Sequence, residues 1–314
     1  MVADGLMGIA IRGWGTALPE KVLTNADLAE MVDTSDEWIV ERTGIRERRI
    51  GGTTAGLATE AGQRAIASAG VDPATIDLLI LATTTPDQSV PATASSVQHA
   101  LGLSCGAMDL NAACSGFTYG ITVAAGMAAV GAKRILVIGA ETLSRITDWE
   151  DRSTCILFAD GAGAVVVDHV EGPGALLGWD LGSDGSLVHL LYCDHAGTIQ
   201  MAGKEVFRQA VRVMVDSSTR SLAQAGLTAA DVDLVVPHQA NTRIIESACS
   251  KLGIPMEKAA IVLPWTGNTS SASIPLALVD ALEHDRVHDG DIVLLVGFGA
   301  GMTSASAVLR WPGT

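Results

Sequence analysis

Residues 69–81 read AGVDPATIDLLIL and residues 225–237 read AGLTAADVDLVVP, so one pattern occurs twice in the chain. Each copy predicts the end of a helix, a short polar link and then a strand. Gly70 and Gly226 stand where the last turn of a helix favours a left-handed residue. The apolar run that follows in each copy is typical of a strand buried on both faces.

Two further pairs of segments have nearly the same separation. RILVIG (134–139) is similar to IVLLVG (292–297). The alanine-rich helix expected after Cys114 corresponds to one expected over TSSASIPLALVDAL (269–282). Three matches in the same order along the chain indicate a gene duplication.

The repeat predicts an α/β fold made of two duplicated halves. The N-terminal half covers residues 1–171 and the C-terminal half covers residues 172–314. Alternating apolar strands and helices predict mixed, mostly parallel sheets, with helices packed between and around them. The stretch 172–200 is rich in glycine and polar residues, so we expect a loop there that joins the halves.

The composition limits the possible functions. The net charge of −15 argues against nucleic acid and against anionic membranes as partners. Five scattered cysteines without a CxxC pair fit reduced thiols in the cytoplasm, and the chain shows no secretion signal. Residues 110–132 carry no charge, but their glycine and polar residues favour a buried helix over a membrane span.

Three polar residues follow predicted strands where α/β folds bind ligands. Cys114 stands between a strand and a helix in DLNAACSGF, His238 follows a strand in VVPHQAN, and Asn268 lies in TGNTSS. Because duplication brings two sets of strand ends together, we expect these residues to converge. The helix N-terminus would favour the thiolate of Cys114. That thiolate would take up an acyl group, and the two neutral donors would stabilise a developing enolate oxygen.

Each residue also has a structural interpretation. Alone, Cys114 is a small core residue, His238 is a loop histidine, and Asn268 is a turn or capping residue. A papain-like protease uses the same residue types, but Cys114 lacks the CGSCW-like surroundings. The glycine motifs lack the third glycine of a dinucleotide-binding loop, and the polar surroundings of His284 and His288 argue against a metal site.

Six motifs together resemble the thiolase superfamily, and most closely the β-ketoacyl-acyl-carrier-protein synthase III family. In order they are TSDEWIVERTGIRERR (34–49), DLNAACSGF (109–117), DRSTCILFADGAGA (151–164), VPHQANTRI (236–244), GNTSSASIP (267–275) and GFGAGM (297–302). The resemblance runs from about residue 8 to residue 311. It implies a five-layered α-β-α-β-α fold, a homodimer, and an enzyme that starts fatty-acid or polyketide chains.

The resemblance also implies a role for each matching residue. An acyl-CoA would load Cys114, and malonyl-acyl carrier protein would then lose CO2 while His238 and Asn268 hold the enolate oxygen. Coenzyme A thioester is thus a substrate, and no separate cofactor is implied. The backbone N–H groups of Cys114 and Ala300 would form the oxyanion hole. The implied coenzyme A contacts are Trp38, Arg42 and Arg152, and the implied acyl pocket comprises Val90 from the neighbouring subunit, Phe158, Met201 and Gly203.

Basic residues at helical spacing indicate where an acidic carrier protein would dock. Lys204, Arg208 and Arg212 form one stripe, and residues 204–258 hold seven basic and six acidic residues in an otherwise strongly acidic chain. Such a surface suits an acidic partner, although a solvated helix face gives the same pattern. The resemblance adds Arg243 and Lys251 to this surface.

Two positions depart from the family pattern. Val90 replaces a large aromatic residue of acetyl-selective members, and Met302 and Ser304 replace a common aromatic pair. Both changes predict a roomier pocket and therefore branched or longer primers. They leave open a starter-unit ketosynthase of a secondary-metabolite pathway and an acyltransferase that uses an alcohol or amine. A non-catalytic interaction subunit is a more remote alternative.

Overall fold

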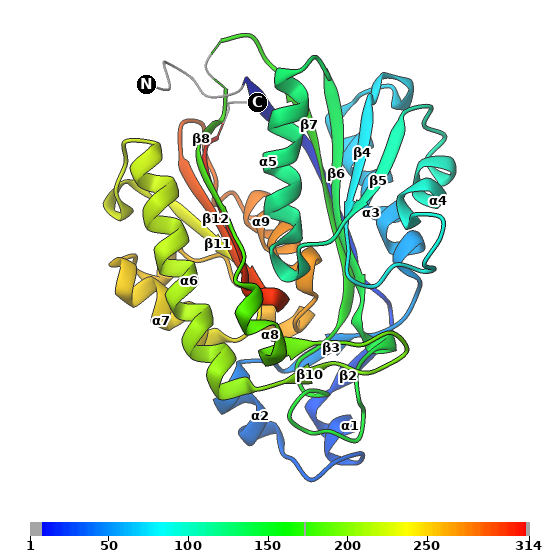
Figure 1. Cartoon of the computed structure of the whole chain (residues 1–314), viewed down its shortest axis with the longest axis vertical. Coiled ribbons are helices and arrows are strands. Elements are labelled where there is room, and N and C mark those ends of the chain that lie inside the picture. The colour runs from blue at the N-terminus through cyan, green and yellow to red at the C-terminus, as the bar shows by residue number, and fades with distance from the viewer. Residues whose placement is uncertain (1–7, 173, 312–314) are drawn as a thin grey trace.

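Two β-sheets stand side by side in the computed structural model, which describes residues 8–172 and 174–311 (Figure 1). In spatial order, the first sheet consists of β1 (Ile9–Ala17), β7 (Asp160–His169), β6 (Arg134–Thr142), β4 (Leu78–Ala82) and β5 (Gly106–Leu110). The second consists of β11 (Leu234–Pro237), β12 (Ile292–Gly299), β13 (Thr303–Arg310) and β8 (Leu176–Gly182).

Helices fill the space between the sheets and cover both outer faces. α5 (Gly116–Ala129) and α9 (Ser273–Glu283) lie between the sheets (Figure 1). α3 (Thr54–Ala69) and α4 (Thr93–Ala100) cover the first sheet, and α6 (Gly203–Gln224) and α7 (Thr242–Leu252) cover the second. This arrangement confirms the five-layered α-β-α-β-α fold. The shorter elements are β2 (Val22–Thr24), α1 (Asn25–Ala29), α2 (Asp36–Thr43), β3 (Glu47–Arg49), β9 (Leu191–Tyr192), β10 (Gln200–Met201) and α8 (Leu263–Thr266).

The two sheets share one strand order, which is consistent with a duplication. β4, β6, β7 and β1 correspond to β11, β12, β13 and β8, and each set has one parallel pairing followed by two antiparallel ones. The first sheet adds β5, which is parallel to β4. In the second sheet, the place beside β11 that corresponds to β5 is taken by an isolated parallel bridge between Val235 and Ala259. Both sheets are therefore mixed, as predicted. The parallel pairs are β4 with β5, β4 with β6, and β11 with β12, and the other strand pairs of these two sheets are antiparallel. The sheets are therefore less parallel than predicted.

The segment 172–200 is not simply a loop. It contains β8, which pairs with β13 and forms an edge of the second sheet. Its glycines suggested turns, but Gly178 has a packing role: a Cβ there would lie 2.2 Å from the backbone oxygen of Ser221 in α6. The glycine therefore lets helix and strand approach closely, which the sequence pattern concealed.

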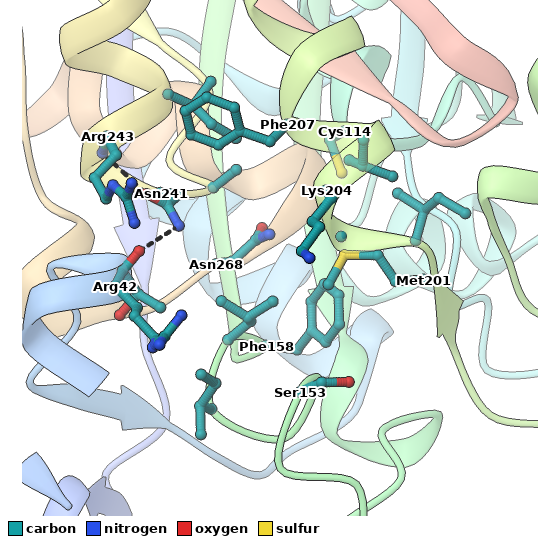
Figure 2. Close-up of a pocket in the computed structure, with 18 of the residues that line it drawn as sticks. Arg42, Cys114, Ser153, Phe158, Met201, Lys204, Phe207, Asn241, Arg243 and Asn268 are labelled. Atoms are coloured by element: carbon teal, nitrogen blue, oxygen red, sulfur yellow. Dashed lines mark hydrogen bonds between the residues drawn. The ribbon is translucent and has the colours of Figure 1, made fainter. Parts of the chain in front are cut away.

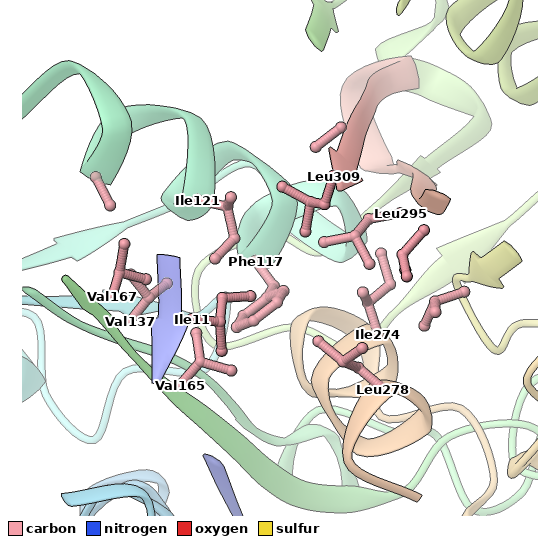
Figure 3. Close-up of a cluster of buried hydrophobic side chains, with 14 of the residues drawn as sticks. Ile11, Phe117, Ile121, Val137, Val165, Val167, Ile274, Leu278, Leu295 and Leu309 are labelled. Carbon is pink, nitrogen blue, oxygen red and sulfur yellow. The ribbon is translucent and has the colours of Figure 1, made fainter. Parts of the chain in front are cut away.

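The main hydrophobic core lies between the sheets, around α5 and α9 (Figure 3). Phe117 and Ile121 of α5 pack there with residues from the inner faces of both sheets. The uncharged stretch 110–132 thus provides a buried helix, as predicted. Among the described residues, no helix has the length and apolar character needed to cross a membrane.

We expect Gly178→Ala to lower the free energy of unfolding by about 1–3 kcal/mol, because its Cβ would press against the backbone of α6. Urea unfolding followed by circular dichroism measures the change. Gly185→Ala is the matched control, since its Cβ would meet no atom within 4 Å. Equal stabilities for the two variants would contradict this explanation.

Candidate active site

Cys114 and Asn268 lie in two turns with the same local geometry. The side-chain oxygen of Asn111 accepts a hydrogen bond from the Ala113 N–H at 3.2 Å, and that of Asn268 accepts one from the Ser270 N–H at 2.9 Å. Ala113 and Ser270 both have positive φ angles, 49° and 48°. A short 3-10 turn then leads into α5 or α9. The two turns therefore occupy equivalent positions in the two sheets, and they contact each other.

The Cys114 side chain is buried at the N-terminal end of α5, as the sequence predicts. Its predicted ionisation is wrong for the free protein, however. Burial raises the pKa of the thiol to about 12, and the negative charge of Glu141 acts in the same direction. Loss of hydration therefore outweighs the side-chain contribution of Ser270 and the backbone hydrogen bond, which both lower the pKa, and Cys114 is a thiol at neutral pH.

His238 follows β11 directly and is also buried. Burial lowers the pKa of its imidazole to about 3, so the ring is neutral at physiological pH. Its Nδ1 lies 2.7 Å from the Ser273 hydroxyl, which already accepts a hydrogen bond from the Gln239 N–H at 3.3 Å. Donation of the Ser273 hydroxyl hydrogen to Nδ1 is compatible with this contact and would place the ring hydrogen on Nε2. Phe298 packs edge-on against the ring, at a centroid distance of 5.3 Å.

Asn268 is held by its backbone. Its N–H donates to Leu157 and its carbonyl accepts from Ala159, both at 2.9 Å. Because the side-chain oxygen is bound by Ser270, the amide NH2 group is the end available to a ligand. Asn268 and His238 thus both present neutral hydrogen-bond donors, and both line the same cavity as Cys114.

Two cavities meet at Cys114. The first has a volume of about 600 Å³ and extends from Cys114 past Asn268 to a rim of basic residues (Figure 2). The second, of about 850 Å³, is lined by Ala300, Arg145 and residues 191–196. Phe158 and Leu191 line both cavities, as Cys114 does. The basic residues of the first cavity are Arg42, Lys204, Arg208 and Arg243.

Comparison with known proteins places this geometry in one family. Residues 108–185 match the family model of 3-oxoacyl-[acyl-carrier-protein] synthase III, and residues 222–311 match the model of its C-terminal part. The β-ketoacyl-[acyl-carrier-protein] synthase III of Roseiflexus castenholzii is 49% identical over 96% of this chain and 98% of its own length. The chain belongs to the β-ketoacyl-acyl-carrier-protein synthase III family.

Solved structures agree with this membership. The 3-oxoacyl-[acyl-carrier-protein] synthase III of Aquifex aeolicus superimposes with a TM-score of 0.95, at 47% identity, over 97% of this chain and 100% of that one. The priming β-ketosynthase of the R1128 polyketide biosynthetic pathway superimposes with a TM-score of 0.93, at 35% identity, over 100% of this chain and 99% of that one. Members of this synthase family are acyltransferases with the thiolase-like fold that we describe.

The residues expected to contact coenzyme A lie together at the rim of the first cavity. Trp38 and Arg42 line it. The guanidinium groups of Arg42 and Arg152 lie 4.5 Å and 5.1 Å from the centre of the Trp38 ring. Arg152 also donates a hydrogen bond to the backbone oxygen of Asp33 at 2.6 Å. The aromatic ring and both cations therefore form one surface patch.

The residues expected to dock a carrier protein are less tightly grouped. Lys204, Arg208 and Arg243 line the rim of the first cavity, whereas Arg212 and Lys251 are exposed but line neither cavity. Lys204, Arg208 and Arg212 are all exposed on α6, as a helical stripe requires, and their role in docking stays a prediction.

The residues expected in the acyl pocket do not all line the same cavity. Phe158 lines both cavities, while Met201 and Gly203 line the first, on the side of the basic rim. Val90 is 85% exposed and lines neither cavity of its own chain. Met302 is buried against the outer core of the second sheet and does not line either cavity, so it gives no direct support to a roomier pocket.

Several residues around the site escaped sequence reasoning. Ser273 and Ser270 lie within the recognised GNTSSASIP motif, but only the folded chain brings them to His238 and Cys114. Glu141 is a fully buried acid at the end of the apolar strand β6, and that position was the available signal. Gly299 lies in the recognised GFGAGM motif, but only the folded chain shows that a Cβ there would lie 2.6 Å from the backbone nitrogen of Cys114.

The neutral His238 makes stability depend on pH. Its pKa in the folded chain is about 3, below the usual 6.5, so its contribution is complete above pH 6.5 and is lost as the pH falls towards 3. In that range we expect the unfolding free energy of the wild type to fall more steeply than that of His238→Gln, by up to about 1 kcal/mol per pH unit. Urea unfolding at several pH values measures both slopes, and parallel slopes would refute the assignment.

Proposed function

We propose that this protein is a β-ketoacyl-acyl-carrier-protein synthase III that transfers an acyl group from acyl-CoA to Cys114 and condenses it with malonyl-acyl carrier protein. The main support for this proposal is that two cavities meet at Cys114, next to the neutral side chains of His238 and Asn268. One cavity with a basic rim suits phosphate-bearing substrates, and the other offers space for an acyl chain. The names of the relatives support the same reaction.

In the first half-reaction, the sulfur of Cys114 attacks the carbonyl carbon of the acyl-CoA thioester. The thioester bond to coenzyme A breaks, and coenzyme A leaves with the proton of the thiol. The developing oxyanion would be held by the backbone N–H groups of Cys114 and Ala300. The close approach of Gly299 to the Cys114 backbone nitrogen supports this assignment, because it brings the two backbone segments together.

In the second half-reaction, the malonyl carbon–carboxylate bond breaks and CO2 leaves. The remaining electron pair forms an enolate, whose oxygen would accept hydrogen bonds from His238 Nε2 and the Asn268 amide. Neutral donors are suited to this task, since they stabilise the enolate without protonating it. The enolate carbon then attacks the acyl thioester on Cys114, which forms the β-ketoacyl product and releases the cysteine as a thiolate. This thiolate takes up a proton from water, which restores the thiol.

Binding of the substrates is assigned to the rim of the first cavity. Trp38, Arg42 and Arg152 would contact coenzyme A through its base and phosphates, since aromatic faces and guanidinium groups suit both. An acidic carrier protein would dock on the basic surface outside the same opening. The residues that we assign to docking are Lys204, Arg208, Arg212, Arg243 and Lys251. We place the reaction in the cytoplasm, because free cysteines, including the nucleophile, need a reducing compartment.

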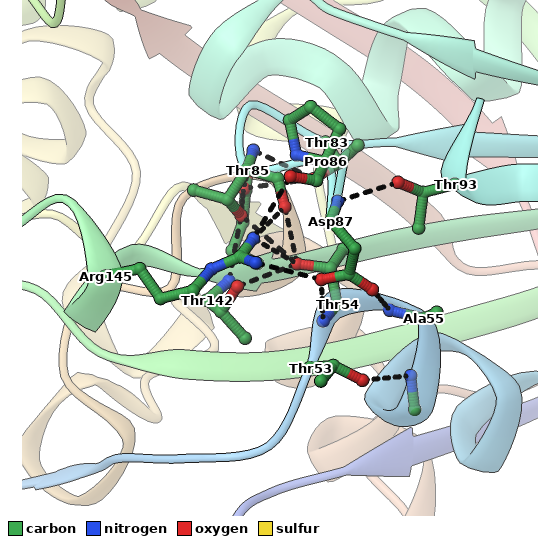
Figure 4. A network of polar contacts seen from close by, with 12 residues as sticks. Thr53, Thr54, Ala55, Thr83, Thr85, Pro86, Asp87, Thr93, Thr142 and Arg145 are labelled. Atoms are coloured by element: carbon green, nitrogen blue, oxygen red, sulfur yellow. Dashed lines mark hydrogen bonds and ion pairs between the residues drawn. The ribbon is translucent and has the colours of Figure 1, made fainter. Parts of the chain in front are cut away.

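We further propose that the enzyme is a homodimer and that Val90 completes the acyl cavity of the neighbouring subunit. β5 is an edge strand with half-buried side chains, which is suited to pairing with a second copy. The exposed Val90 follows Asp87, whose carboxylate binds the N–H groups of Thr54 and Ala55 and pairs with Arg145 (Figure 4). The chain at Asp87 is thus held in place by these contacts. The exposed Val90, three residues later, can therefore enter the neighbouring subunit in a defined position.

We propose that the primer is a branched or longer acyl group, because a valine at position 90 leaves more room in the acyl cavity than an aromatic side chain would. A starter-unit role in a secondary-metabolite pathway is the second candidate. The match to a priming polyketide ketosynthase, at 35% identity over the whole chain, favours it. The two candidates share both half-reactions and differ in the pathway that uses the product.

The proposed roles can be separated by mass spectrometry of the intact protein. We expect an acyl adduct on the wild type after incubation with a panel of acyl-CoAs, and none on Cys114→Ser. Asn268→Ala should load normally and condense at least about 100-fold more slowly with malonyl-acyl carrier protein, since it loses a transition-state donor. Equal loss of loading and condensation would contradict the division of roles.

The same experiment distinguishes the alternatives. An adduct that forms no β-ketoacyl product and releases no CO2 with malonyl-acyl carrier protein would favour an acyltransferase with an alcohol or amine acceptor. The absence of an adduct with every acyl-CoA would refute the nucleophilic role of Cys114 and favour a non-catalytic interaction subunit.

Val90 tests the dimer and the primer class together. We expect the protein to sediment as a dimer, and Val90→Phe to slow loading of a branched acyl-CoA by about tenfold relative to acetyl-CoA. Val188→Phe is the matched control, because Val188 is also an exposed valine but belongs to another surface segment. A monomer in sedimentation velocity, or unchanged selectivity in Val90→Phe, would overturn this assignment.

A further inference from the structure

Arg48 of β3 is an arginine without exposed surface, and the reaction outlined above does not use it. Its guanidinium group donates hydrogen bonds to two separate parts of the chain. Nε, at 3.1 Å, and Nη2 both donate to the backbone oxygen of Ile156, and Nη1 donates to the side-chain oxygen of Asn25. Both acceptors are neutral, so these hydrogen bonds offset only part of the free energy that burial of the cation costs.

Asn25 extends this connection to α2. Its amide NH2 group donates to Asp36 Oδ1 at 2.7 Å and to the backbone oxygen of Ile45 at 2.9 Å. Asp36 begins α2, and Ile45 follows the glycine that ends it. Only one orientation of the amide satisfies these two acceptors and the donor from Arg48. Arg48 and Asn25 thus connect Ile156 to both ends of α2.

The two elements that Arg48 connects carry the residues assigned to coenzyme A. Trp38 and Arg42 stand on α2, and Arg152 stands in the segment of residues 151–157, which we call the Arg152 segment. Ile156 belongs to this segment, which is held together by its own backbone hydrogen bonds. The Arg152 guanidinium lies 5.1 Å from the centre of the Trp38 ring, so the surface patch spans the junction of the two elements. Its geometry therefore depends on how α2 lies against the Arg152 segment.

Other contacts between these elements restrain them less. Ile39 of α2 and Ile156 belong to one hydrophobic cluster, but hydrophobic contact is non-directional. Arg152 donates to the backbone oxygen of Asp33, just before α2, but its side chain is half-exposed, so water competes for both groups. The hydrogen bonds of Arg48 are buried, and the planar guanidinium gives them fixed directions.

We propose that Arg48 is a positioning residue for the recognition of coenzyme A. Through its hydrogen bonds to Ile156 and Asn25, it sets α2 against the Arg152 segment, so that the aromatic ring and both cations of the patch meet the nucleotide part of coenzyme A together. Arg48 itself lines neither cavity. The inference rests on the proposed binding of coenzyme A, and it predicts weaker binding of the nucleotide part without a change in the chemistry at Cys114.

Asp36→Ala removes the last hydrogen bond of this connection at an exposed residue, so we expect the variant to fold. Its dissociation constant for coenzyme A, measured by isothermal titration calorimetry, should rise about tenfold, as expected for one lost charge-assisted hydrogen bond. Asp36→Asn should keep the wild-type affinity, since its amide oxygen can still accept from Asn25.

Glu37→Ala is the matched control, because Glu37 is also an exposed acid in the first turn of α2 and its loss changes the charge equally. Equal affinities of Asp36→Ala and the wild type, or equal changes in Asp36→Ala and Glu37→Ala, would overturn this inference alone. A wild type that does not bind coenzyme A would refute the proposed function as well.

Arg48→Lys tests the centre of the connection. Lysine keeps the charge but lacks the planar fork that binds two acceptors at once. In the loading of Cys114, we expect KM for an acyl-CoA to rise about tenfold and kcat to stay within about twofold. KM for the matching acyl-N-acetylcysteamine thioester, which lacks the nucleotide, should not change.

A purely structural role of Arg48 predicts the same loss with both thioesters. Arg134→Lys is the control for loss of an arginine fork, since Arg134 binds both oxygens of Asp168 and lines neither cavity. Equal increases of KM for the two thioesters, or an unchanged KM for acyl-CoA, would contradict the inference. The comparison of Asp36→Ala with Glu37→Ala decides the question if Arg48→Lys does not fold.

Discussion

The structure depends on the burial of two helix N-termini between two sheets. α5 and α9 fill the central layer, and the turns that begin them meet where Cys114 and Asn268 lie. Each turn needs a residue with positive φ, and each is closed by an asparagine side chain that binds the backbone two residues later. The strain at Ala113 and Ser270 is maintained because tightly packed layers surround both turns.

Burial also decides the charges of the site. It keeps Cys114 protonated, although a helix N-terminus favours the thiolate, and it keeps His238 neutral even at pH values at which a free imidazole takes up a proton. His238, with its hydrogen on Nε2, and Asn268, whose side-chain oxygen is bound by Ser270, can both donate a hydrogen bond without carrying a charge. Such a pair is suited to an enolate that must react with an acyl carbon before it takes up a proton.

The surface around the first cavity has a different physical character. Its basic residues stand on α2, α6 and α7, which belong to different parts of the chain, and they are exposed on a protein whose net charge is −15. The hydrogen bond from the Asn241 side chain to the backbone oxygen of Arg42, 2.8 Å long, connects the two sides of this rim. The buried catalytic residues and the charged opening of the cavity are thus two different environments, one for the reaction and one for recognition of the substrates.

The sequence by itself determined the repeat, the strand-to-helix positions of Cys114 and Asn268, and the buried character of α5, because these depend on local periodicity and on glycine. It did not determine β8, whose Gly178 is explained only by contact with α6. It also predicted an ionised cysteine, because the dipole of a helix is local whereas desolvation depends on every layer around the thiol. Only the tertiary structure decided the ionisation of the site, the hydrogen-bonding role of Ser273, and the hydrogen bond between Glu141 and Ser270. The hydrogen-bonded pairs are 35 residues apart for Ser273 and His238 and 129 residues apart for Ser270 and Glu141, and a linear chain carries no periodic signal for such contacts.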